Sequence, residues 1–202
     1  MKKQPIVTLE GLTREQQKIV IAQDVIENIK AQKYIAETGS YIDDVEDARG
    51  NNMKYNNRWK DEDVKAQWEQ LGTCNVCGIG ACLMSITKFK NNLTFGDLPS
   101  SLSQFEKVHI DLLSSIFTGV ELAAIEAMFE GYYSNDKLGT SSGNNIGRDE
   151  MGAVLSEDLI EYCLNFGDNY GNEERTLLAI MQYIVDHNGE VYPKELHTES
   201  SN

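Results

Sequence analysis

Apolar residues recur at intervals of three and four along most of the chain, which is the spacing of an amphipathic helix. The clearest helix begins after Thr13, which forms a capping-box pattern with Gln16, and we expect it to run to about Glu37 and to stop at Gly39. Further helices are expected at residues 61–71, 77–86, 108–117, 118–130, 155–166 and 172–188. The pattern therefore predicts an all-α fold, a compact bundle of about six or seven helices.

Polar and glycine-rich stretches separate these helices and are expected to form loops, at residues 41–57, 91–103 and 131–152. The last of these is long enough to favour a mobile, functional loop. Extended structure is expected at most in two short pieces, residues 5–9 and 189–192. Because the chain has neither an internal repeat nor a linker, we predict one α-helical domain over residues 1–193, followed by a flexible polar tail over 194–202.

Negative charge is concentrated in the C-terminal half of the chain. The formal net charge of the 202 residues is −14, and residues 101–202 contribute −13 of it, with 18 acidic and 5 basic side chains. Such a half repels nucleic-acid phosphates, so no direct nucleic-acid binding is expected. It favours a basic protein partner, although acidic side chains also simply keep a helical surface soluble. No apolar run reaches membrane-spanning length, and no apolar segment follows Lys2 and Lys3; a cytoplasmic protein without a membrane contact is therefore expected.

Three of the four cysteines lie close together, in the segment Cys74-Asn-Val-Cys77-Gly-Ile-Gly-Ala-Cys82. Two thiolates at the Cys-x-x-Cys spacing can share one tetrahedral zinc ion, so Cys74, Cys77 and Cys82 are candidate metal ligands. A second ligand pair is missing from the sequence, and a redox role lacks the βαβ surroundings that support it. Buried, inert thiols are the favoured interpretation, and no cofactor is expected unless it is zinc, with the fourth ligand open among Cys163, His109 and His187.

The same segment, followed by Leu83 and Ser85, resembles a Cys-x-x-Cys-x-x-Gly-Ala element of uncharacterised phage and bacterial proteins, with Gly78 standing where alanine is expected. Residues 117–130 and 175–193 resemble later blocks of the same group, and with the N-terminal helix the likeness covers about half of the chain. The resemblance implies a phage or bacterial origin and a shared fold, and it implies no activity.

A pair of glutamates stands out on the expected helix at residues 118–130. Glu126 and Glu130 are four residues apart and therefore lie on one helix face, where burial would make them share a proton or hold a metal. The Glu-x-x-His motifs of a di-metal bundle are absent from the sequence. Together with Glu121 they are the candidate interaction residues of the acidic half. Four further carboxylates in residues 43–47 lack the ligand pattern of a calcium loop and are expected to be solvated.

No sequence motif of a known catalytic centre is present, and this absence favours a binding protein over an enzyme. The first hypothesis is a non-enzymatic intracellular binding protein, a phage-encoded accessory factor that engages a host protein through its acidic C-terminal half. One alternative is a protein that binds or sequesters a nucleotide signal; its cationic side chains would come from Arg14, Arg49, Lys54, Arg58 and Lys60. The other alternative is an adaptor protein whose fold is held by zinc. The sequence predicts no oligomeric state.

Overall fold

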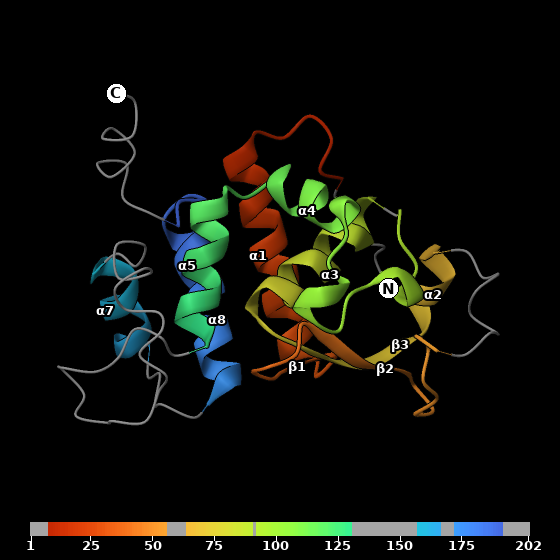
Figure 1. Ribbon diagram of the computed structural model, residues 1–202. Coiled ribbons are helices and arrows are strands. Elements are labelled where there is room, and N and C mark those ends of the chain that lie inside the picture. The colour runs from red at the N-terminus through yellow and green to blue at the C-terminus, as the bar shows by residue number, and fades with distance from the viewer. Residues whose placement is uncertain (1–7, 56–63, 91, 131–156, 167–171, 192–202) are drawn as a thin grey trace, which may run out of the picture.

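The computed structural model describes residues 8–55, 64–90, 92–130, 157–166 and 172–191, and it contains a sheet as well as helices (Figure 1). The strands are β1 (Tyr34–Ala36), β2 (Ile42–Asp47) and β3 (Leu71–Val76). Their order is β1-β3-β2, with β1 parallel and β2 antiparallel to β3. The all-α prediction is therefore wrong: the fold is a mixed α/β one.

The two longer strands were missed because the period of two that identifies a strand is absent from β2 and covers only the end of β3. In β2 the buried residues Ile42 and Val45 are three apart, because the pairing with β3 shifts register twice and Asp44 adopts a left-handed conformation, with φ 44°. In β3 the buried residues Leu71 and Cys74 are also three apart, and only Cys74 and Val76 are separated by two positions. Residues 41–57 are polar, acidic and rich in asparagine and were therefore predicted as a loop. The helical spacing of Val64, Trp68 and Leu71 led to the prediction of Leu71 as the end of a helix.

Helix termini agree better with the sequence. α1 (Arg14–Lys30) begins at Thr13 with the expected capping box, and α8 (Glu173–Asp186) begins at Asn172, whose side chain accepts the Arg175 N–H. However, α1 ends before Ala31 and Gln32 takes up a left-handed conformation (φ 58°), so the predicted extension to Glu37 is wrong. A glycine usually occupies that conformation, and its absence here hid the end of the helix.

Some helices pack against one side of the sheet, and further helices pack against these. α1 and α3 (Gly78–Lys90) lie above the sheet in Figure 1, and α8 packs against α1 and against α5 (Gly119–Phe129). α4 (Lys107–Ser114) contacts α3, α7 (Glu157–Asn165) contacts α8, and α2 (Val64–Gln70) leads directly into β3. One continuous hydrophobic core joins these elements. The expected loop at residues 131–152 and the tail lie outside the described residues.

The start of α3 is where the helices, the sheet and the connecting segments meet most closely. The carbonyl of Tyr41, just before β2, accepts the N–H of Cys77 at 3.1 Å. A Cβ atom on Gly80 would lie 1.8 Å from the same carbonyl oxygen. A Cβ on Gly78 would lie 3.1 Å from Ile125 of α5. The two glycines therefore allow the backbone at Tyr41 and helix α5 to approach the first turn of α3 from two sides.

Replacing Gly80 with alanine is expected to lower the free energy of unfolding by about 3 kcal/mol or more, because the new methyl group overlaps the Tyr41 carbonyl and backbone must move. Urea denaturation followed by circular dichroism measures the loss. The matched control is Gly119→Ala at the first residue of α5, where a Cβ meets nothing within 4 Å. Equal destabilisation by both substitutions would contradict the role of the close approach.

Candidate functional site

The cysteine segment is divided between a strand and a helix, and its thiols are buried. Cys74 lies in β3, Cys77 immediately precedes α3 and Cys82 lies in its second turn; all three are free, and none is more than 1% exposed. Burial raises the pKa of each thiol, which keeps it protonated. Within the described ranges no group of three His, Cys, Asp or Glu side chains is placed to hold a metal ion. The geometry thus offers no support for zinc ligation by these thiols.

The structure does bring one of these cysteines to the predicted glutamate pair. Glu126 lies on α5 and Glu130 caps the C-terminal end of that helix, beside the first turn of α3. Glu130 Oε1 accepts the N–H of Gly39 at 3.4 Å. Burial, and secondly the charge of Glu130, raise the pKa of Glu126 to about 7. The Ile79 N–H, the Cys77 thiol and the Tyr41 hydroxyl, which can all donate to a carboxylate, act in the opposite direction.

One oxygen of Glu126 is left without any partner: Oε2 is buried and makes no hydrogen bond in the structure. An unpaired oxygen of this kind is costly for an ionised carboxylate and much less so for a protonated one. The geometry therefore favours the protonated form of Glu126, and the sharing of that proton with Glu130 stays a prediction. The geometry does not favour the predicted metal ion, since the groups next to Glu126 are the hydrogen-bond donors of Ile79 and Tyr41 and the protonated thiol of Cys77.

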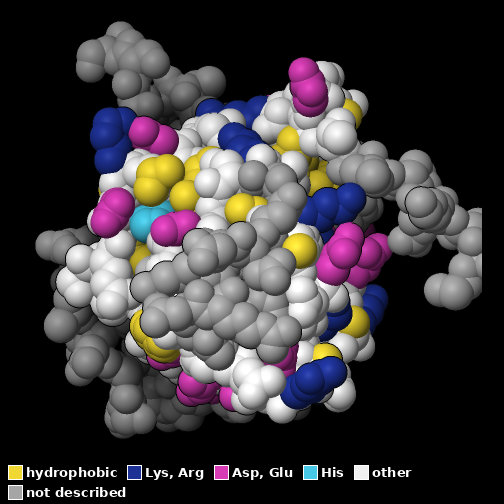
Figure 2. Space-filling view, turned by 90° about the vertical axis from the view of Figure 1, so that its right-hand side faces the viewer, with side chains coloured by type: hydrophobic (Ala, Val, Ile, Leu, Met, Phe, Trp, Pro, Cys, Tyr) yellow, Lys and Arg dark blue, Asp and Glu magenta, His cyan; other side chains and the backbone are white. Residues whose placement is uncertain are grey.

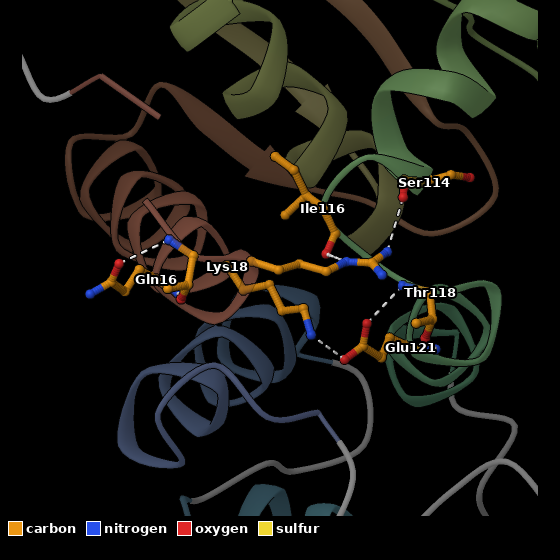
Figure 3. A network of polar contacts seen from close by, with 8 residues as sticks. Gln16, Lys18, Ser114, Ile116, Thr118 and Glu121 are labelled. Atoms are coloured by element: carbon orange, nitrogen blue, oxygen red, sulfur yellow. Dashed lines mark hydrogen bonds and ion pairs between the residues drawn. The ribbon is translucent and has the colours of Figure 1, made fainter. Parts of the chain in front are cut away.

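Glu121, the third predicted interaction residue, points into the protein (Figure 3). Its side chain is 4% exposed and forms an ion pair with Lys18 of α1, which is 6% exposed. Its second oxygen accepts the N–H of Thr118 at 2.7 Å and so completes the predicted capping box of α5. Next to this pair, Arg14 donates to the carbonyls of Ile116 and Ser114 at 2.6 and 2.9 Å. Glu121 therefore joins α1 to α5 and presents no carboxylate to a partner.

A cavity of about 480 Å³ lies elsewhere, between Lys54 and Tyr55, which follow β2, and the segment that leads into α4. Its wall contains Lys54, Tyr55, Leu93, Gly96, Asp97, Leu98, Pro99, Gln104, Glu106, Val108 and His109. Nothing in the sequence pattern pointed to this cavity, because its residues come from two stretches almost forty positions apart. The exposed side chains of Tyr55 and Val108 mark this part of the surface, but their exposure is visible only in the structure.

Two of the polar residues in the wall have structural roles. Lys54 is 7% exposed, and its ammonium group donates to the Ile42 carbonyl at 3.0 Å and to the Ser100 hydroxyl at 2.6 Å. Burial lowers its pKa. His109 Nδ1 accepts the Glu106 N–H at 2.9 Å, so the proton is on Nε2, which donates to the Asp97 carbonyl at 2.7 Å. With both nitrogens engaged, His109 is available neither as a base nor as a metal ligand.

The carboxylates of the wall are differently placed. Asp97 and Glu106 are exposed, and each caps a short helical segment, η2 (Phe95–Asp97) and α4 respectively. The three ion pairs among the described residues, Lys18–Glu121, Lys88–Asp24 and Lys107–Asp111, involve neither of them. From the side on which α2 lies, hydrophobic, acidic and basic side chains are all seen on the surface (Figure 2). The wall of the cavity itself combines the exposed carboxylates of Asp97 and Glu106 with the exposed apolar side chains of Tyr55 and Val108.

Breaking the buried ion pair should destabilise the protein strongly. Lys18→Met leaves the carboxylate of Glu121 buried and uncompensated, and we expect a loss of about 3–5 kcal/mol in the free energy of unfolding. The double variant Lys18→Met/Glu121→Gln should recover most of the loss, because glutamine is neutral and still completes a capping box. Lys107→Met, in an exposed pair with Asp111, is the control and should change little. Urea denaturation of the wild type, the two single variants and the double variant measures these losses. A double variant no more stable than Lys18→Met would contradict the role given to the buried charge.

Comparison with other proteins adds no relative. The sequence matches no protein-family model, no curated protein and no solved structure. The resemblance of residues 74–85 to uncharacterised phage and bacterial proteins therefore stays an expectation. Among the described helices none alone is long and apolar enough to cross a membrane; α4 and α5 reach that length only together, across a bend of 98°. The two candidate sites of this protein are therefore the Glu126 carboxyl group with its neighbours and the wall of the cavity beside α4.

Proposed function

We propose that this protein is a non-enzymatic binding protein, and that it engages a basic segment of a partner protein at the cavity beside α4. The observation that carries the proposal is the composition of the cavity's open side. Asp97 and Glu106 are exposed carboxylates that form no ion pair with any residue of the described part of the chain, and they stand next to exposed apolar side chains. The net charge of −14 adds a long-range attraction for such a segment.

Apolar contact area is available around the cavity. Tyr55 is 67% exposed and Val108 38%, and both belong to its wall. Leu102, on the short helix η3 (Leu102–Gln104) that also supplies Gln104, is 72% exposed. Aromatic and aliphatic side chains of this kind form the centres of protein interfaces, whereas carboxylates at the rim select the charge of the partner. The proposed contact surface, defined as Tyr55, Asp97, Leu102, Glu106 and Val108, provides both.

A small anionic ligand, such as a nucleotide, is the second candidate, and Lys54 is the observation that favours it. This lysine is more than nine-tenths buried in the wall and has no carboxylate within ion-pair distance in the described part of the chain. Two of its three N–H groups already donate to protein oxygens, and two carboxylates stand in the same wall. Both facts weaken the attraction for an anion, so the basic partner is the preferred candidate.

The two candidates predict opposite effects of the same substitutions. Short amphipathic peptides that contain lysine, arginine and leucine are the probe for the first, with norleucine in place of the basic residues as the comparison. Binding to the basic peptides, measured by fluorescence anisotropy, is expected to weaken by about tenfold in Asp97→Asn/Glu106→Gln and to fall with added salt. A panel of nucleotides, measured by calorimetry, should bind the same variant more tightly, and Lys54→Met less tightly.

A matched pair of apolar substitutions tests the surface itself. Leu102→Ser should weaken binding of the basic peptides, whereas Ile35→Ser should not, since Ile35 is 47% exposed on β1 and is not part of the cavity wall. Equal binding of basic and norleucine peptides, or equal effects of the two serine variants, would count against the proposed partner. Saturable nucleotide binding that depends on Lys54 would favour the small anionic ligand over the basic partner.

A further inference from the structure

We infer that the cavity beside α4 recognises the C-terminal end of its partner: the terminal carboxylate binds the ammonium group of Lys54, and basic side chains just before it bind the carboxylates of Asp97 and Glu106. This assignment rests on the proposed function and adds which part of the partner chain binds. It starts from a property of the wall that a basic segment alone leaves unused, namely a buried cation in the same wall as two exposed carboxylates.

The ammonium group of Lys54 has one N–H to spare. It donates to the Ile42 carbonyl at 3.0 Å and to the Ser100 hydroxyl at 2.6 Å, and no third acceptor bonds to it among the described residues. A lysine ammonium carries three donors, so the third points away from both of these oxygens. The side chain is more than nine-tenths buried, yet it takes part in none of the ion pairs of the described ranges. A ligand oxygen in the cavity would supply the missing acceptor.

A carboxylate suits this position better than a neutral oxygen does. Burial lowers the pKa of Lys54, and the charge of Asp43 opposes this effect only in part. The folded protein therefore stabilises the ammonium charge less well than water does. A ligand carboxylate brings the opposite charge, and a hydrogen bond between two charged groups is about twice as strong as one between neutral groups.

The positive and the negative groups of the wall are close neighbours that do not pair with one another. A Cβ atom on Gly96, the residue before Asp97, would lie 3.4 Å from the Lys54 carbonyl oxygen, so the two segments are in contact. Asp97 accepts the N–H and the hydroxyl of Thr94 with Oδ2, at 2.9 and 2.6 Å, and its Oδ1 makes no hydrogen bond with the described residues. A ligand with a carboxylate at its end and a cation shortly before it would therefore complement both signs of charge.

The size of the cavity favours the end of a chain. Its volume of about 480 Å³ is that of a small-ligand pocket, which holds a short stretch of chain and excludes a folded element. A C-terminus enters with chain leaving on one side, whereas an internal acidic residue brings chain on both sides. The ring of Tyr55, whose centroid lies 6.0 Å from Lys54 Nζ, offers apolar contact to the last side chain.

The experiment uses the full chain and three peptides of one basic, leucine-containing sequence with the same fluorophore at the N-terminus. The first ends in a free carboxylate, the second in an amide, and the third in an amide with a glutamate three residues before the end. Fluorescence anisotropy should show that the wild type binds the first about tenfold more tightly than either amide, the gain of one charged hydrogen bond.

The affinity ratio of the free and amidated peptides identifies the residue responsible. In Lys54→Met the ratio should fall to about one. Lys107→Met is the matched control: it removes the same charge from an exposed lysine that pairs with Asp111 and is not part of the wall, so the tenfold ratio should remain. A ratio cancels any change in long-range attraction, because both peptides carry the same basic residues.

A measurement on the wild type covers the case in which Lys54→Met does not fold. The ¹³Cε NMR signal of Lys54 follows the protonation of its amine. Its midpoint should move to higher pH when the free-carboxylate peptide binds and should move less with the amide, since an adjacent carboxylate favours the ammonium form.

The outcomes separate this inference from the proposed function. If the wild type binds the amide, or the internal-glutamate peptide, as tightly as the free carboxylate, the inference is overturned and the basic partner stands. A free-carboxylate preference that persists in Lys54→Met, or a Lys54 midpoint that responds equally to both peptides, overturns it as well. Failure of all three peptides to bind would contradict the proposed function and, with it, the inference.

Discussion

The carbonyl of Tyr41 is the point on which the arrangement of the other elements depends. It accepts a hydrogen bond from Cys77, and the missing side chain of Gly80 gives it room to lie against α3. That one contact fixes the entry to β2, the end of β3 and the start of α3 relative to one another. On the other side of the same helix turn, Gly78 lets α5 approach closely enough for Glu126 to reach Cys77 and Tyr41. The polar cluster is therefore a consequence of backbone packing, and the cysteines are small enough to fit within it.

Helices could be predicted from this sequence because their signals are local. The capping boxes at Thr13 and Thr118 each need only two side chains three residues apart, and both are present in the structure. The sheet could not be predicted, since β1 has three residues, β2 buries residues three apart and β3 alternates only at its last three residues. Their pairing depends on partners distant in the sequence. Bulges erase the alternation that would have revealed them.

The candidate sites show the same division between local and distant information. The shared face of Glu126 and Glu130 follows from helix geometry and was predictable, as was the special character of the cysteine segment. The sequence could not show which of the cysteines lies near the glutamates, because this depends on how α5 packs against α3. Glu121 could be read only as a surface acid or a helix cap; its pairing with Lys18 joins residues 103 positions apart. The cavity could not be predicted from the sequence for the same reason, since Lys54 and His109 are far apart along the chain and line one wall only in the folded protein.

The irregular, acidic course of β2 also affects how the protein behaves toward copies of itself. β2 is an outer strand of the described sheet, and four of its six residues are Asp or Glu. An outer strand exposes unpaired backbone groups that can recruit a strand from another molecule. Negative charges and the left-handed kink at Asp44 prevent a second β2 from aligning beside it. The carboxylates that look like an unused ion site in the sequence thus protect the sheet edge from aggregation.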